Sequence, residues 1–323
     1  MNPARPATTF AAVIDVFGDA DALHPAEIPI ADLSDVQVQL DVAAAAVNPV
    51  DLTTRAGRNI PDSDARFPMV LGWDVAGTIV AVGANVADWQ VGDRVAAMVF
   101  QPIDQHGVYA QRVNLDADLL ARVPAGLDLR QAATVPLAGL TASQLLDQAR
   151  VDEARTLLVN GPLGAVGRSI VALAARAGIE VIGVVRPQQA DELRALGATL
   201  AVDRGEFADT VRRHHPDGVD AAIDLVGGAA ARAALDAVRD GGRYATAVPP
   251  YIDPSGPFET ERDIAVHVHT VHPDTARLTE LLTLAAQHAL PTPVEHTYPL
   301  DQAADAHRRQ AAGGLTGRIL LIP

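Results

Sequence analysis

The sequence predicts an α/β fold in two parts: a β-rich, barrel-like part and a doubly wound parallel sheet. The chain has 323 residues, which corresponds to about two domains of usual size. Up to about residue 125, short strands alternate with turns, as in small barrels. From residue 127 to 271, strand-length apolar runs alternate with helix-length segments. That alternation is typical of a parallel sheet covered by helices.

Composition excludes several classes of protein. Apolar residues make up 49% and charged residues 20% of the chain, which is typical of globular proteins rather than disordered ones. A net charge of −15 argues against nucleic-acid partners and anionic membranes. The sequence has neither an apolar run of about 18 residues nor an N-terminal signal-peptide pattern. We therefore expect a soluble, cytoplasmic protein with a small-molecule substrate.

Two residue types are absent from the sequence. Without cysteine, the chain has no disulfide, thiolate nucleophile, iron–sulfur cluster or cysteine-ligated zinc. Without lysine, it has no Schiff-base chemistry.

Two patterns predict strands in the β-rich part: alternation of apolar and polar residues, and apolar runs bounded by turns. Residues 36–42 alternate apolar and polar side chains, which predicts a half-buried strand. An apolar run over residues 75–82 ends at Gly83, and a turn at residues 91–93 leads into a further strand.

The second part shows strands and helices in strict alternation. Strands are predicted at 156–160, 180–185, 200–202, 219–226 and 243–248, with helices at 165–177, 188–196, from 206, and at 229–238. This series predicts a parallel, doubly wound sheet. After a Pro/Gly-rich loop at 249–257 come a strand at 264–271, a helix at 278–288 and a strand at 317–322. This tail either caps the α/β part or returns to the first part.

The sharpest motif is a glycine-rich loop between the strand 156–160 and the helix 165–177. It reads Gly161-Pro-Leu-Gly164-Ala-Val-Gly167. Gly164 lets backbone approach a pyrophosphate, and Gly167 allows close packing of helix on strand. Proline replaces the usual first glycine, and three spaced glycines alone also suit a tight turn. The surrounding strands and helices favour a dinucleotide-binding loop.

The end of the next strand indicates which dinucleotide binds. An acidic residue there holds the ribose 2′-hydroxyl of NAD, whereas an arginine accommodates the 2′-phosphate of NADP. The sequence places Arg186 there, with no carboxylate before Asp191. Arg186 therefore favours NADPH, although an exposed arginine with no ligand is the alternative.

Several motifs in order along nearly the whole chain resemble the medium-chain dehydrogenase/reductase superfamily. They are most similar to its zinc-free quinone oxidoreductase branch. The matching segments are 48–51, 67–83, 91–95, 107–111, 132–142, the glycine loop, 220–228 and 317–318. The resemblance implies a GroES-like β-barrel catalytic domain (residues 1–126 and 272–323) around a Rossmann dinucleotide-binding domain (127–271). It also implies a cleft between the two domains, where nicotinamide meets substrate.

The resemblance implies roles for individual residues. Asn48 and Thr141 lie beside the nicotinamide and its ribose, and Asn48 is the expected hydrogen-bond donor in catalysis. The proton then comes from solvent or a ribose hydroxyl. The implied cofactor contacts are Asn48, Thr141, Gly161, Leu163, Gly164, Ala165, Val166, Gly167, Arg186, Leu225, Val226, Ala247, Val248 and Arg318.

The sequence also departs from its relatives. Zinc-dependent relatives carry Gly-His-Glu where this chain has Gly72-Trp73-Asp74, and tryptophan cannot ligate zinc. We therefore expect no metal. The branch often has a tyrosine where this chain has Thr53, so polarisation of the substrate by that tyrosine is lost. Thr53 and Trp73 are expected in the substrate pocket, with an ordinary core position as the alternative for Trp73.

The remaining histidines have structural interpretations. His267, His269 and His272 suggest a titrating or interface strip on an edge strand, where subunits of this family pair into a homodimer, more than a metal site. His214 and His215 lie at a helix end, where cations suit the helix dipole.

These observations favour an NADPH-dependent, metal-free reductase of quinones or α,β-unsaturated carbonyls. Two alternatives stay open. One is an enoyl-thioester reductase on the same scaffold, and the other is a non-catalytic NADPH-binding sensor or structural protein. Turnover of a panel of quinones, alkenals and enoyl thioesters separates the three.

Overall fold

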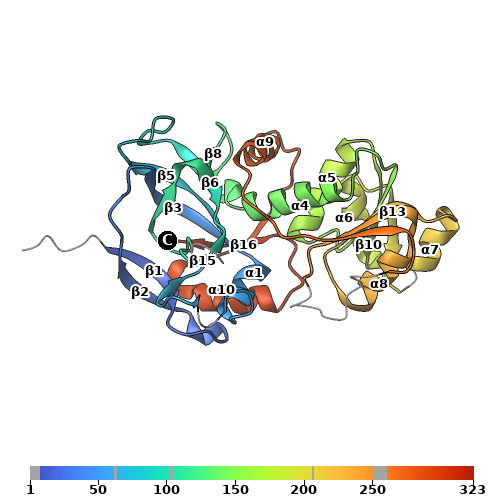
Figure 1. Ribbon diagram of the computed structural model, residues 1–323, viewed down its shortest axis with the longest axis horizontal. Helices are drawn as coiled ribbons and strands as arrows, with labels where there is room; N and C mark the ends of the chain where they lie inside the picture. The colour runs from blue at the N-terminus through green and yellow to red at the C-terminus, as the bar shows by residue number, and fades with distance from the viewer. Residues whose placement is uncertain (1–7, 62–63, 102–104, 206, 250–259) are drawn as a thin grey trace, which may run out of the picture. The chain divides into compact units, whose positions relative to one another are not determined.

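The computed structural model describes the chain except residues 1–7, 62–63, 102–104, 206 and 250–259. Its contacts divide the chain into two compact units. The first comprises residues 1–137, 273–288 and 292–323, and the second comprises residues 138–272 and 289–291. In Figure 1 the blue and teal strands belong to the first unit and most yellow and orange elements to the second.

A seven-stranded sheet dominates the first unit. Its strands run in the order β15 (Val294–Pro299), β16 (Arg318–Ile322), β3 (Gln37–Val47), β5 (Asp74–Val82), β6 (Arg94–Met98) and β8 (Leu120–Arg122), and β7 (Arg112–Asp116) also pairs with β3. β16 is antiparallel to β3, with Leu320 opposite Ala46. The C-terminal tail therefore returns to the first part of the chain, which decides between the two alternatives that the sequence left open.

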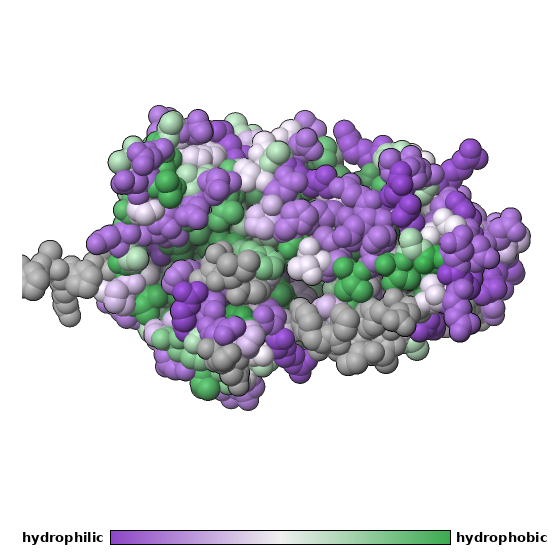
Figure 2. Space-filling view, in the orientation of Figure 1, coloured by the Kyte–Doolittle hydropathy of each residue, from purple (hydrophilic) through white to green (hydrophobic). Residues whose placement is uncertain are grey.

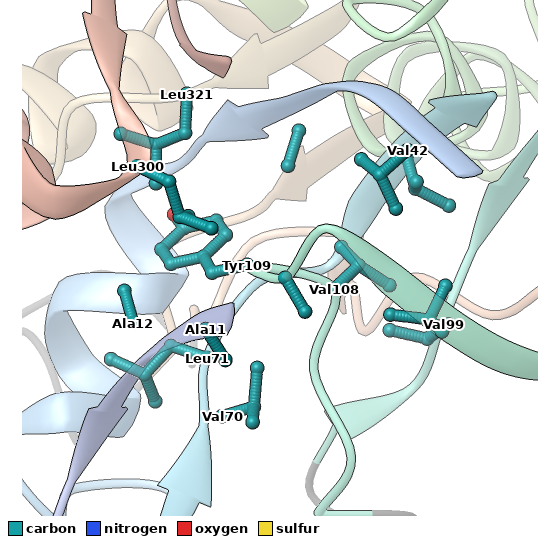
Figure 3. Packing of buried hydrophobic residues seen from close by; sticks show 14 of the residues in the cluster. Ala11, Ala12, Val42, Val70, Leu71, Val99, Val108, Tyr109, Leu300 and Leu321 are labelled. Carbon is teal, nitrogen blue, oxygen red and sulfur yellow. The ribbon is translucent and has the colours of Figure 1, made fainter. Parts of the chain in front are cut away.

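A smaller sheet shares the core of the first unit. It has the order β2 (His24–Pro29), β1 (Thr8–Ile14) and β4 (Met69–Val70). One apolar cluster draws residues from both sheets, and Figure 3 shows the Tyr109 ring within it, between Leu71 and Leu300. Gly72 has φ +109°, and a Cβ there would lie 2.4 Å from Cδ1 of Tyr109. Packing around this buried ring thus requires glycine at position 72.

Short helices connect the strands of the first unit. They are η1 (Ala20–Ala22), α1 (Pro49–Arg55), η3 (Ala117–Leu119), α3 (Leu129–Ala132), α9 (Thr275–Ala286), η5 (Leu300–Gln302) and α10 (Ala303–Ala311). Helix α1 was not predicted. It is favoured by Pro49 at its first position and by Asp51, whose carboxylate accepts a hydrogen bond from the Asn48 amide at 2.7 Å.

The second unit is built on a parallel sheet of six strands. Their order is β11 (Leu200–Asp203), β10 (Glu180–Val185), β9 (Thr156–Asn160), β12 (Val219–Asp224), β13 (Val238–Thr246) and β14 (Ile264–Val268). Chain order reverses between β9 and β12, so their carboxyl ends form the switch point at which such sheets bind ligands. The predicted doubly wound sheet, and with it the GroES-like plus Rossmann α/β class, is confirmed.

Helices cover both faces of this sheet. They are α4 (Pro136–Gln148), which begins in the first unit, α5 (Ala165–Arg176), η4 (Pro187–Gln189), α6 (Ala190–Ala195), α7 (Phe207–His214) and α8 (Gly228–Asp236). Leu157 and Val159 pack with α4 and α5, whereas Leu158 packs with α7 and α8. Figure 2 shows a hydrophilic surface over α7. Among the described residues, no helix has the length and apolar character needed to cross a membrane.

Most predicted elements of the second part are found, with shifted ends. β9 and β10 have the predicted bounds, whereas the strand predicted at 219–226 ends at Asp224. The reason is a turn: the Asp224 carboxylate accepts hydrogen bonds from the amides of Val226 and Gly227. The strand predicted at 264–271 likewise ends early, at Val268. Of the predicted loop at 249–257, only Pro249 lies within the described residues.

Candidate active site

The glycine loop joins β9 to α5 at the carboxyl end of the parallel sheet. Gly161 has φ +88°, a left-handed conformation that glycine adopts without strain. A Cβ on Gly167 would lie 2.1 Å from the carbonyl oxygen of Gly161 and 2.7 Å from Cα of Pro162. The first turn of α5 therefore lies against the loop backbone at a distance that only glycine allows.

Gly164 belongs to the same loop but, unlike Gly167, is not closely packed. It is exposed and forms the N-cap of α5, and the atom nearest to a Cβ built there lies 3.7 Å away. Since the first amides of a helix have no partner within the helix, this end of α5 offers donors and a positive dipole end to an anion. The half-buried Leu163, Ala165 and Val166 flank it.

The predicted lining residues follow two neighbouring strand ends. Leu225 and Val226 come directly after β12, and Ala247 and Val248 come directly after β13. They are half-buried or exposed, with Val226 at 54% exposure. A Cβ on Gly161 would lie 3.0 Å from Cγ2 of Val226, so this turn packs on the glycine loop. The structure thus brings together, at one edge of the second unit, residues from three strand ends.

Arg186 and Thr141 belong to the same unit. Arg186 follows β10, is exposed, and donates from Nε to Oε1 of Gln189 at 3.1 Å. Its guanidinium is thus accessible at the strand end where the sequence placed it. Thr141 lies on α4 and is 5% exposed. Its predicted contact with the nicotinamide remains a prediction.

Asn48 and Arg318 meet a buried carboxylate in the first unit. Asn48 Nδ2 donates to Asp74 Oδ2 at 3.0 Å and to the Ala46 carbonyl at 3.2 Å. Arg318 donates to Asn48 Oδ1 at 2.7 Å and to Asp74 Oδ2 at 3.0 Å. The amide of Leu137, in the first turn of α4, donates to Asp74 Oδ1 at 2.7 Å. One carboxylate therefore ties together α1, α4, β5 and β16.

These contacts limit the roles expected for Asn48 and Arg318. Both N–H groups of the Asn48 amide are engaged, so a bond from it to a substrate carbonyl requires one of them to break. Arg318 is only 6% exposed and is held by Asp74 and Asn48. Its expected contact with the cofactor phosphates stays a prediction, and that contact requires the guanidinium to leave this buried network.

Two buried carboxyl groups in this unit have shifted pKa values. Burial raises the pKa of Asp51 to about 7, although the hydrogen bond from the backbone N–H of Asn48 lowers it. Burial likewise raises the pKa of Asp74 to about 6, although the charge of Arg318 lowers it. Desolvation exceeds the gain from these partners for both groups.

Neither of the two residues expected in the substrate pocket lies on an open surface. Trp73 is 3% exposed and packs edge-on against Phe100, with ring centroids 5.2 Å apart. This matches the alternative of a packed aromatic. Thr53 lies on α1, half-buried, and its hydroxyl donates to the Val50 carbonyl at 2.9 Å. A pocket role for either residue remains a prediction.

One residue of the histidine strip, His269, differs from the expectation of a titrating surface group. β14 is an edge strand of the sheet, but His269 is 5% exposed and burial lowers its pKa to about 4. His269 is therefore neutral near pH 7 and does not titrate as a surface group would. Within the described residues, no three His, Cys, Asp or Glu side chains gather as a metal site would need.

Sequence reasoning missed the buried carboxylates. Asp51 and Asp74 stand in motifs quoted for the family resemblance, and Asp224 ends a predicted strand. Arg168 was missed as well: it donates from Nε to the Leu163 carbonyl at 2.9 Å and so braces the glycine loop. A charged residue inside an apolar run was the available signal, because buried charges need partners.

The comparisons with known proteins agree with this architecture. Residues 34–125 match the alcohol dehydrogenase GroES-like domain, and residues 196–321 match the zinc-binding dehydrogenase family. The quinone oxidoreductase of Coxiella burnetii has a similar structure, with a TM-score of 0.85, 25% identity, and coverage of 98% of this chain and 100% of that one.

Two curated relatives are more similar in sequence. The NADPH-dependent alkenal/one oxidoreductase of Arabidopsis thaliana is 32% identical over 234 residues, which are 70% of this chain and 59% of that protein. A mycocerosic acid synthase-like polyketide synthase of Mycobacterium tuberculosis is 33% identical over 301 residues, or 88% of this chain. The chain spans only 14% of the length of that synthase.

The GroES-like domain and the parallel sheet with its glycine loop together define the class of fold. The chain belongs to the medium-chain dehydrogenase/reductase superfamily, in its quinone oxidoreductase-like branch.

Substitution of Gly164 and of Gly167 in this loop should affect stability differently. Gly167→Ala should lower the free energy of unfolding by about 1–3 kcal/mol, because its Cβ meets backbone that cannot yield. Gly164→Ala meets no atom within 3.7 Å and should unfold near the wild-type temperature. Thermal unfolding of both variants checks this. Equal destabilisation by the two would contradict the packing argument.

Asp51→Asn should change how stability depends on pH. Burial raises the pKa of Asp51 in the folded state to about 7, above the ordinary aspartate value of 3.8. The native state therefore binds more protons than the unfolded state between these values, and wild type loses stability as pH rises from about 4 to 7. Asparagine does not titrate, so the variant should gain on wild type by a few kcal/mol over that range. Denaturant unfolding at pH 5 and pH 8 measures the gain, and a pH-independent difference would contradict it.

Proposed function

We propose that this chain is an NADPH-dependent reductase that delivers hydride to quinones or α,β-unsaturated carbonyl compounds without a metal. The observation that carries the proposal is the glycine loop. It caps α5 at the switch point of the parallel sheet, with Gly167 packed on Gly161 so that the helix end stays open. Sheets of this order bind dinucleotides at that place.

The residues of the second unit fit NADPH. The glycine loop and the first turn of α5 suit a pyrophosphate, since no side chain stands at the N-cap. Arg186, exposed beyond β10, suits a 2′-phosphate because its guanidinium can donate to phosphate oxygens. Leu225, Val226, Ala247 and Val248 would contact the cofactor from the ends of β12 and β13. Thr141 on α4 is proposed beside the nicotinamide.

We assign residues 1–126 with 272–323 to the catalytic domain and residues 127–271 to the cofactor domain. When bound, NADPH supplies a hydride, and negative charge then develops on the carbonyl oxygen of the substrate. Donors must stabilise that charge. Asn48 can donate to that oxygen only if it breaks one of its hydrogen bonds to Asp74 and the Ala46 carbonyl. In this proposal, Trp73 and Thr53 shape the substrate pocket. A homodimer paired along the edge strand β14 completes the proposal.

Metal independence is supported by the ligand types that the chain offers. It has no cysteine, and tryptophan occupies the position of the histidine ligand at residue 73. The buried Asp74 is held by Arg318 at 3.0 Å rather than left open for a cation.

An enoyl-thioester reductase is the second candidate. The similarity to polyketide synthases over 88% of this chain favours it. Both candidates use the same cofactor site, so they differ only in the acceptor of the hydride.

Turnover of a panel of acceptors tests the proposal. Quinones and alkenals should oxidise NADPH faster than enoyl thioesters, as followed by the loss of absorbance of the nicotinamide. EDTA should leave the rates unchanged. Turnover of thioesters alone would favour the second candidate, and NADPH binding without any turnover would favour a non-catalytic protein. Loss of activity with EDTA, restored by zinc, would refute metal independence.

Arg186→Ala should raise KM for NADPH much more than KM for NADH. A charge-assisted contact to the 2′-phosphate contributes about 1.5–3 kcal/mol, or roughly 10- to 150-fold in KM. Arg155→Ala is the matched control, because Arg155 is exposed just before the amino end of β9. Initial-rate kinetics with both cofactors measure the effect. An equal change for NADPH and NADH would remove Arg186 from this role.

A further inference from the structure

Asp224 has more hydrogen bonds than a strand end requires. It is the last residue of β12 and is fully buried. Its Oδ1 accepts from Nδ2 of Asn160 at 2.6 Å, and its Oδ2 accepts from the Thr246 hydroxyl at 3.2 Å. The amides of Val226, at 3.3 Å, and Gly227, at 3.0 Å, donate to the same carboxylate. One side chain thus joins the ends of β9, β12 and β13.

These bonds reach the turns that follow each strand. The Thr246 hydroxyl accepts from the amide of Val248 at 3.0 Å. The amide of Ala247 donates to the Asp224 carbonyl at 3.2 Å, and the amide of Leu225 donates to the Asn160 carbonyl at 3.0 Å. The backbone of both turns is therefore fixed, directly or through Thr246, by residue 224.

Asp224 is poorly suited to contact a ligand itself. Its exposure is 0%, and burial raises its pKa while the donors around it lower it. The turns beside it are open by contrast, with Val226 at 54% exposure. What Asp224 controls is thus the placement of its neighbours.

The order of the strands indicates which half of a dinucleotide these turns would meet. A dinucleotide lies across the switch point, with one mononucleotide half over each side of the sheet. The glycine loop and Arg186 belong to the side of β9 and β10. The turns after β12 and β13 belong to the other side. That is the side of the nicotinamide half.

We propose that Asp224 is a positioning residue that sets the turns 225–227 and 247–248 for the nicotinamide half of the cofactor. The assignment rests on the proposed function. Asparagine at position 224 would present one acceptor oxygen and an N–H₂ group to a site filled with donors. The turns would then lose part of their anchor without any change in side-chain volume.

The same strand supplies a matched control. Asp220 lies at the amino end of β12, four residues earlier. Its carboxylate accepts from the amides of Arg155 at 2.8 Å and Thr156 at 3.0 Å, and from Nε of Arg239 at 2.8 Å. Asp220→Asn removes the charge from a comparably bonded carboxylate at the opposite end of the same strand.

The experiment compares Asp224→Asn and Asp220→Asn in the full chain. Two probes are titrated by fluorescence or calorimetry: NADPH, and adenosine 2′,5′-bisphosphate, which lacks the nicotinamide half. Both variants should unfold at lower temperature than wild type. Asp224→Asn alone should weaken NADPH binding 10-fold or more while affinity for adenosine 2′,5′-bisphosphate stays within twofold. Asp220→Asn should leave both affinities within twofold.

Three results would overturn the assignment. They are NADPH affinity of Asp224→Asn within twofold of wild type, equal weakening of both probes, and equal weakening of NADPH by Asp220→Asn. If wild type bound adenosine 2′,5′-bisphosphate but not NADPH, or neither probe, the proposed function itself would fail first.

A second pair of variants applies if Asp224→Asn does not fold. Thr246→Val removes the hydroxyl between Asp224 and Val248 with little change of shape, and Thr246→Ser keeps that hydroxyl. Thr246→Val should weaken NADPH binding about fivefold with adenosine 2′,5′-bisphosphate unchanged, and Thr246→Ser should restore it. Equal affinities in the two variants would refute the link from Asp224 to the turn.

Discussion

The contact between Gly167 and the Gly161 carbonyl is the constraint on which the rest of the second unit depends. Any Cβ at position 167 would lie 2.1 Å from that oxygen, so α5 can lie on the strand end only with glycine there. Because α5 then also packs on β9 and β10, the covered face of the sheet follows from the same contact. This packing leaves the end of α5 open at Gly164, where the proposed function places the pyrophosphate of the cofactor.

Each unit also contains a buried carboxylate that joins segments far apart in sequence. Asp74 binds residues 48, 137 and 318 in the first unit, and Asp224 binds residues 160 and 246 in the second. Asp74 has a guanidinium among its partners, whereas the partners of Asp224 described above are an amide side chain, a hydroxyl and two backbone amides, all neutral donors. Burial of such groups costs free energy. A buried polar network offsets that cost only when it is well satisfied, and it then fixes one arrangement of the chain.

The two networks have different consequences for chemistry. In the first unit, Asn48 and Arg318 donate to Asp74 and its neighbours. The residue expected in catalysis, Asn48, and a residue expected at the cofactor, Arg318, are therefore both engaged in structure. In the second unit, the network stays below the surface and leaves Leu225 and Val226 at the open edge. The network around Asp74 therefore engages predicted site residues directly. The network around Asp224 lies beneath the turn that carries predicted site residues.

The sequence by itself determined the class of fold, the strands β9 and β10 to the residue, the glycine loop and the exposed Arg186, because periodicity and glycine spacing are local properties. It also determined that no cysteine could ligate zinc. Tertiary structure alone decided that the C-terminal strand pairs with β3, that Trp73 is packed against Phe100, and that Asn48 and Arg318 meet at Asp74. The bond between Arg318 and Asn48 alone joins residues 270 positions apart, and no local pattern records which distant group will satisfy a buried charge.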